Sequence, residues 1–181
     1  KYPSLTNILN TKSLATKSIQ NNTTYDIQII NRDGIESTEK LNTYEILVVH
    51  EKIDLLMSYE NEPSLITSLK HEPYSLLNIA IQYGSINTIQ CLFDKLDKNQ
   101  KKLAIKHLFQ TRKLSCANEH ILDHVFSQIT PQEQAEILLD VDGEGLRACL
   151  INNYIDNLKL LLSKLDDKDK KRLITRYYWS H

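Results

Sequence analysis

The sequence predicts an all-α chain in which short helical units repeat and stack as a solenoid, after a short N-terminal segment that is irregular or forms a β-hairpin. Three observations lead to this prediction. Only 4 glycines and 4 prolines occur in 181 residues, a composition that favours helices over a sheet-and-turn architecture. Apolar residues recur with helical spacing from about Ser37 onward. Finally, residues 76–102 return at 145–171 with eight identities.

The N-terminal segment, residues 1–36, differs in composition from residues 37–181. Residues 1–24 are rich in Ser, Thr and Asn. Alternating Tyr25, Ile27 and Ile29 precede an Asp33-Gly34 pair, a pattern that predicts a small hairpin or an edge strand. We therefore expect an irregular segment with a short hairpin over 1–36, and one helical repeat domain over 37–181.

Several helix starts are marked by local signals. Pro63 suits the first turn of the helix that follows it. The stretch TPQE at 130–133 predicts a capping box with proline at the first helical position. Asp97, and either Asp166 or Asp167, precede lysine-rich helical stretches and can cap them. These signals predict where the lysine-rich helices begin.

The repeat defines two clear units and a worn unit between them, each about 33 to 36 residues long. A shift of 33 places Phe126 of the worn unit on Phe93 of the first. Gly84 and its counterpart Asn153 stand where the first helix of each clear unit must stop. Glycine and asparagine tolerate a left-handed backbone best, so we expect both residues to be left-handed hinges.

A unit of this size cannot bury its apolar stripe alone, and stacking on neighbouring units supplies the missing core. The side chains expected to be mostly inaccessible are Leu77, Ala80, Ile89, Leu92, Phe93, Leu146, Cys149, Leu158, Leu161 and Leu162.

These residues resemble the ankyrin repeat family, whose pattern is roughly T-P-L-H-x-A-A-x-x-G-H-L-E-V-V-K-L-L-L. Leu77, Ala80, Gly84 and Ile89 fall on its Leu, first Ala, Gly and later apolar positions. The resemblance covers about residues 74–181, most clearly 75–96 and 144–165. Two departures are Asn78 at the family's His position, and a capped extra helix where the family has a loop. Divergent units of this kind, in a chain rich in Asn, Lys and Ile, look like those of effector proteins from intracellular bacteria.

The resemblance implies a protein–protein interaction module that binds through the concave face of its solenoid, with no catalytic residue and no cofactor. Carrying over the family's contact positions predicts partner-binding side chains at Tyr74, Gln82, Tyr83, Glu144 and Asn152. The implied partner is another protein, a host protein in the case of an effector. The implied setting is a monomer in the cytoplasm, or one secreted into a host cell's cytoplasm. The alternative is a helical domain that positions substrate for, or regulates, a larger enzyme.

Charge and hydropathy argue against two classes of partner. The formal net charge is −1, so no strong field favours nucleic acid or an anionic membrane. The longest apolar run, IDLLM at 53–57, is far too short to span a bilayer. We therefore expect neither nucleic-acid nor membrane binding.

The three cysteines predict reduced thiols rather than a disulfide framework, because their number is odd. Cys91 and Cys149 lie in apolar runs and are expected to be buried and inert. Cys116, with His120 and His124, would share one helix face at i, i+4 and i+8, an alternative that would suit a metal ion or a reactive thiol. No C-x-x-C pair accompanies them, so a packed or solvated helix face, with no bound metal, is the main prediction.

Overall fold

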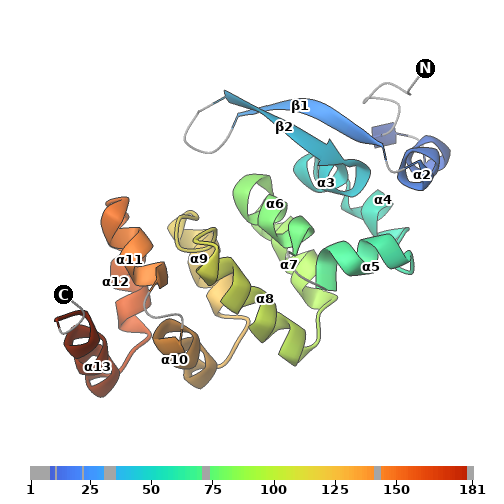
Figure 1. Cartoon of the computed structure of the whole chain (residues 1–181). Coiled ribbons are helices and arrows are strands. Elements are labelled where there is room, and N and C mark those ends of the chain that lie inside the picture. The colour runs from blue at the N-terminus through green and yellow to red at the C-terminus, as the bar shows by residue number, and fades with distance from the viewer. Residues whose placement is uncertain are drawn as a thin grey trace. The chain divides into compact units, whose positions relative to one another are not determined.

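A computed structural model describes residues 9–10, 12–21, 23–30, 36–70, 74–140 and 144–178. In these residues the chain is mostly helical, with a two-stranded antiparallel sheet (Figure 1). Among them, no helix combines the length and the apolar character that crossing a membrane requires. The chain divides into two compact units, Lys1–Leu92 and Phe93–His181. The N-terminal segment and the first helices after it therefore belong to the same unit.

The first unit contains α2 (Lys12–Gln20), β1 (Thr24–Ile30), β2 (Glu36–Asn42), α3 (Thr43–Val49), α4 (Ile53–Met57), α5 (Pro63–Lys70), α6 (Ser75–Tyr83) and most of α7 (Ile86–Asp94). The second unit contains α8 (Lys98–Gln110), α9 (Glu119–Phe126), α10 (Pro131–Asp140), α11 (Glu144–Ile151), α12 (Ile155–Ser163) and α13 (Asp167–Tyr178).

The predicted hairpin is confirmed, with Thr24 of β1 opposite Asn42 of β2. Its Asp33-Gly34 turn lies outside the described residues. Two boundaries were wrong. Helix α2 occupies part of the segment expected to be irregular, and the helices expected from Ser37 begin only at Thr43. Residues 36–42 satisfy their backbone hydrogen bonds against β1 instead of forming a helical turn.

The hairpin belongs to the core of the first unit. Ile29 of β1 and Leu41 of β2 are buried together with Ile46 of α3. Asn42, at the end of β2, also caps α3, because its side chain accepts from the Glu45 amide while the Glu45 carboxylate accepts from the Asn42 amide. The sheet and the first helix are thus joined without a loop.

The predicted helix caps of the second unit are confirmed. Asp97 and Gln100 form a capping box at α8, and Thr130 and Glu133 form one at α10. At α13 the capping side chain is Asp166, whose carboxylate accepts from the Asp169 amide at 2.7 Å. The lysine-rich extra helices therefore start where the sequence predicts.

The two hinge residues differ from each other. Asn153 is left-handed, with φ of 59°, as expected. Gly84 is not left-handed, because its φ of −80° and ψ of 169° are extended. The expectation for Gly84 was wrong, and the reason for a glycine is space. A Cβ at this position would lie 2.7 Å from the carbonyl oxygen of Ala80.

Eight of the ten predicted core side chains are buried; Leu158 and Leu162 of α12 are half-buried. Their counterparts 36 residues earlier, Leu122 and Phe126 of α9, are fully buried. α12 packs against α9 and helps to bury its side chains. The corresponding side chains of α12 stay partly exposed.

Helices recur at regular intervals along the chain. α7, α9 and α12 start at intervals of 33 and 36 residues, and α8, α10 and α13 do the same. Within the second unit, α8 contacts α11, α9 contacts α12 and α10 contacts α13. Residues 111–116, where the worn unit would have its first helix, form turns.

Candidate protein-binding surfaces

Three predicted partner-binding residues lie in the first unit, and one of them is inaccessible. Tyr74 is only 4% exposed and takes a left-handed conformation, with φ of 51°, at the start of α6. The expectation that Tyr74 is a surface anchor was therefore wrong. The sequence places it in a loop beside a proline, a setting that gives no sign of burial.

Tyr83 and Gln82 are half-buried at the end of α6. The Tyr83 hydroxyl donates to Glu39 of β2 at 3.3 Å and accepts from the Gln82 amide at 2.7 Å. The Tyr83 ring packs against the core formed by Ile29, Leu41 and Ile46, and this burial raises the pKa of the phenol. Tyr83 is thus fixed by the hairpin, so removing its ring would disturb packing as well as any contact with a partner.

The other two predicted residues, Glu144 and Asn152, lie on α11 and just after it in the second unit. Glu144 accepts from both Nε and a terminal nitrogen of Arg112, at 3.2 and 2.8 Å. Asn152 donates to the carbonyl of Ala148 at 2.8 Å. The five predicted residues therefore divide between the two units.

An exposed apolar surface surrounds Asn152. Leu150, Ile151, Tyr154 and Ile155 are 59%, 64%, 36% and 43% exposed. We call these four residues the hinge patch. Apolar periodicity alone assigns such residues to a core. The available signal was the comparison of the two copies, because Ile151 and Tyr154 replace the polar Gln82 and Ser85.

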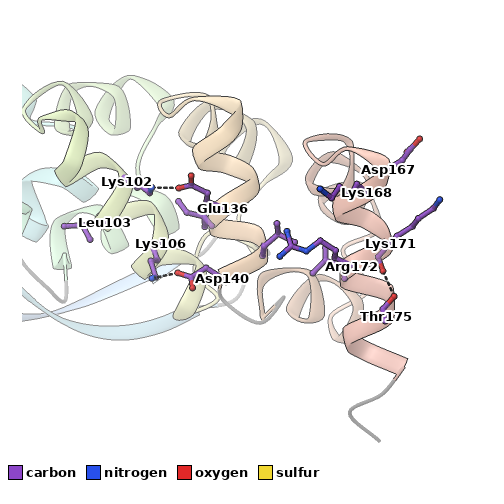
Figure 2. A pocket seen from close by; sticks show the side chains of 13 residues that line it. Lys102, Leu103, Lys106, Glu136, Asp140, Asp167, Lys168, Lys171, Arg172 and Thr175 are labelled. Atoms are coloured by element: carbon purple, nitrogen blue, oxygen red, sulfur yellow. Dashed lines mark hydrogen bonds and ion pairs between the residues drawn. The ribbon is translucent and has the colours of Figure 1, made fainter.

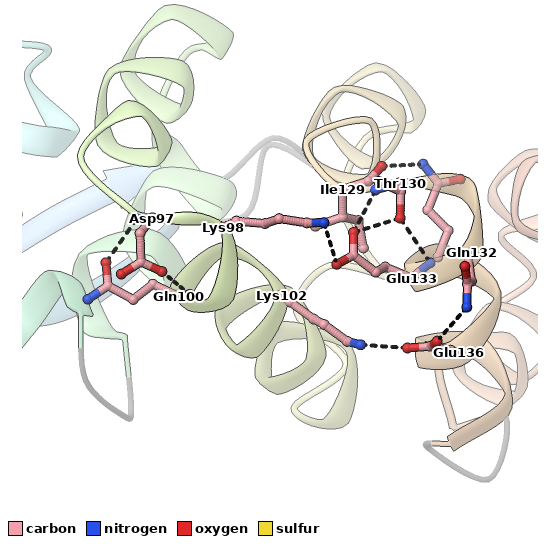
Figure 3. A network of polar contacts seen from close by, with 10 residues as sticks. Asp97, Lys98, Gln100, Lys102, Ile129, Thr130, Gln132, Glu133 and Glu136 are labelled. Atoms are coloured by element: carbon pink, nitrogen blue, oxygen red, sulfur yellow. Dashed lines mark hydrogen bonds and ion pairs between the residues drawn. The ribbon is translucent and has the colours of Figure 1, made fainter.

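The facing sides of α8 and α10 carry a row of ion pairs between residues 34 or 35 positions apart, two of which are drawn in Figure 3. The pairs are Lys98–Glu133, Lys102–Glu136 and Lys106–Asp140, followed by Arg112–Glu144 at the start of α11. Each pair is partly exposed, so each contributes little to stability alone. Together the pairs show that α8 presents a basic side which the acidic helix α10 covers.

Next to this row, an open groove of about 1400 Å³ is lined by α8, α10 and α13 (Figure 2). We call it the outer-helix groove. Its apolar side chains include Leu103, which is 57% exposed, Leu139 and Leu173. Lys168 and Lys171 of α13 line it as well. The groove therefore combines apolar surface with lysines on one side.

The thiol and histidine alternative does not have the expected geometry. Cys116 precedes α9, which begins at Glu119, so it does not share a helix with His120 and His124. His120 is exposed, whereas His124 is half-buried with a buried Nε2 atom that has no partner. In the part of the chain that the structure describes, no three His, Cys, Asp or Glu side chains are grouped so that they could hold a metal ion.

The cysteines are free thiols of unequal exposure. Cys149 is buried as expected, and burial, with Cys116 nearby, raises its pKa to about 12. Its thiol donates to the carbonyl of Ser115 at 3.4 Å. Cys91 is half-buried, so the expectation of full burial was wrong for this residue.

Comparison with known proteins adds no assignment for these surfaces. No protein-family model matches the chain, and neither the curated proteins nor the solved structures compared with it give a match.

Proposed function

We propose that the chain is a protein–protein interaction module built from divergent ankyrin-like repeats, and that the hinge patch is a contact surface for its partner. The observation that carries the proposal is the exposure of four large apolar side chains within residues 150–155. Leaving apolar surface in water costs free energy. Clustered exposed apolar side chains of this kind are typical of interaction sites.

The regular helix intervals support the repeat part of the proposal. Two pairs of helices in the second unit, α9 with α12 and α10 with α13, start 36 residues apart and contact each other. The ion pairs between α8 and α10 have a similar separation. Stacked units of this kind form extended binding surfaces.

Two of the predicted contact residues fit this surface. Asn152 lies between the residues of the hinge patch in the sequence, and Glu144 begins the helix whose last residues, Leu150 and Ile151, belong to the patch. Polar groups beside an apolar centre fix the orientation of a bound partner. Gln82 and Tyr83 occupy the corresponding place at the end of α6 and would form a second contact in the first unit. The likeness to effector repeats extends the proposal to a host protein as partner and to the host cytoplasm as the compartment.

Binding measurements with matched variants test the proposal. The full chain would serve as bait to identify a partner, and calorimetry would then compare the wild type with a Leu150→Ser/Ile151→Ser variant. We expect affinity to fall at least about tenfold, since each truncated contact at the centre of an interface costs on the order of 1 kcal/mol or more. Leu103→Ser is the control, because Leu103 is equally exposed but lies in the outer-helix groove. Equal affinity for the wild type and the double variant would refute the hinge patch as the contact.

A further inference from the structure

The outer-helix groove goes beyond the proposed function, because none of the hinge patch lines it. We propose that this groove binds an acidic amphipathic helix of a partner protein. The inference rests on the charges that line the groove, on its apolar surface, and on the way in which α10 already packs against α8.

The charged side chains that α8 and α10 contribute to the groove already form ion pairs with each other. Lys102 pairs with Glu136, and Lys106 pairs with Asp140 (Figure 2). These four side chains line the groove but offer it no net charge. A partner's charges would therefore be selected mainly by α13.

On α13 the balance is positive. Lys168, Lys171 and Arg172 line the groove together with one carboxylate of α13, Asp167. Asp167 pairs with Lys170, and within the described residues neither Lys168 nor Lys171 has a carboxylate partner. Arg172 pairs with Asp169 through a contact of 3.2 Å, and its side chain is 64% exposed. Figure 2 shows Lys168 and Arg172 extending from α13 towards α10. A surface with unpaired cations favours an acidic partner, by complementary potential.

The apolar surface of the groove favours an acidic protein helix over a nucleic acid as the partner. Leu103, Leu139 and Leu173 line the groove between its charged side chains. A nucleic-acid backbone would gain nothing from these leucines and would meet the carboxylates of Glu136 and Asp140. An amphipathic helix places apolar side chains on one face and charges beside them, and helices of this kind commonly bind in apolar grooves.

The chain itself contains an example of this recognition. Helix α10 carries Glu133, Glu136 and Asp140 at i, i+3 and i+7, and these carboxylates contact the lysines of α8. Its apolar Ile137 and Leu138 are buried. Lys168 extends from α13 towards α10 (Figure 2), so α13 offers the groove a lysine, as α8 offers Lys102 and Lys106 to α10. A helix with the pattern of α10 is therefore the expected occupant.

The probe is a fluorescein-labelled, helix-stabilised peptide with the sequence of residues 130–140, and its anisotropy is followed as the full chain is added. We expect saturable binding that weakens about tenfold or more with Lys168→Glu/Lys171→Glu. The control is Lys113→Glu/Lys159→Glu, which changes net charge equally at exposed lysines outside the groove. A peptide with Glu133→Lys, Glu136→Lys and Asp140→Lys should not bind.

Four results would overturn the inference. They are absence of binding by the acidic peptide, equal weakening by both double variants, displacement of the peptide by an equimolar DNA duplex, and self-association of the chain that Lys168→Glu/Lys171→Glu abolishes. Circular dichroism of each variant confirms that the helices remain. Leu150→Ser/Ile151→Ser should leave peptide affinity unchanged, so the groove and the hinge patch succeed or fail separately.

Discussion

Asn157 supports the turn that stands in place of the worn unit's first helix, and replacing it should destabilise the second unit. Its side chain is 5% exposed. The two hydrogens of its amide bind the carbonyls of Ser115 and Ala117, at 2.9 and 2.7 Å. These carbonyls belong to the turn segment that precedes α9, some 40 residues earlier in the chain. Asn157 thus links α12 to the turn segment before α9.

The expected cost of Asn157→Ala is about 2–3 kcal/mol in the free energy of unfolding. Each lost hydrogen bond contributes about 1 kcal/mol, and a buried acceptor left without a partner adds to this cost. The Ser115 carbonyl keeps its weaker hydrogen bond from the Cys149 thiol. Most of the free-energy cost therefore comes from the Ala117 carbonyl, which loses its bond to Asn157. Asn157→Asp should cost more, because a buried carboxylate would face two carbonyl oxygens.

Urea denaturation followed by circular dichroism measures both variants. Asn152→Ala is the matched control, because the Asn152 amide donates to a carbonyl of its own helix from an exposed position. This control should change stability by less than about 0.5 kcal/mol. The reasoning fails if Asn157→Ala is as mild as the control, or if Asn157→Asp is milder than Asn157→Ala.

Three further predictions follow from local geometry. Gly84→Ala should cost about 1–3 kcal/mol in urea denaturation, because the new Cβ would collide with the Ala80 carbonyl; an unchanged midpoint would contradict this. In the native protein a thiol reagent should modify Cys149 last, because burial keeps its sulfur protonated. Equal modification rates at Cys116 and Cys149 would contradict this order. Burial lowers the pKa of His50 below 6.5 in the folded state, so its contribution to stability is present above pH 6.5 and is lost as pH falls below it. The loss of stability from about pH 7.5 to 5.5 should be smaller in His50→Gln, and an identical pH profile would argue against this.

Features set by neighbouring residues could be predicted from the sequence. The caps at Asp97 and Thr130 depend on side chains three residues apart, so a short stretch contains the whole interaction. The hairpin was predicted for the same reason, although its second strand was assigned to a helix. The pairing partner that makes residues 36–42 a strand is β1, and no local pattern in ESTEKLN specifies it.

The backbone conformation of a single residue and burial by distant elements could not be predicted. A glycine at position 84 is compatible with a left-handed turn or with close approach of another backbone group, and only the structure distinguishes the two. The burial of Tyr74 and the exposure of Leu150 could not be predicted from their local sequence either. A loop tyrosine became buried and an apolar helix residue became exposed, because burial depends on which elements pack on each side.

The turns before α9 bear on where the exposed surface of the second unit lies. Residues 111–116 form turns. Besides its packing on α8, α11 has side-chain contacts with this turn segment. These contacts are Arg112 with Glu144 and Ser115 with Cys149. Both involve the beginning and middle of α11, and they leave its last residues, Leu150 and Ile151, exposed. The contacts with the turn segment therefore leave the end of α11 exposed, and this end is the surface that we propose as a contact for a partner.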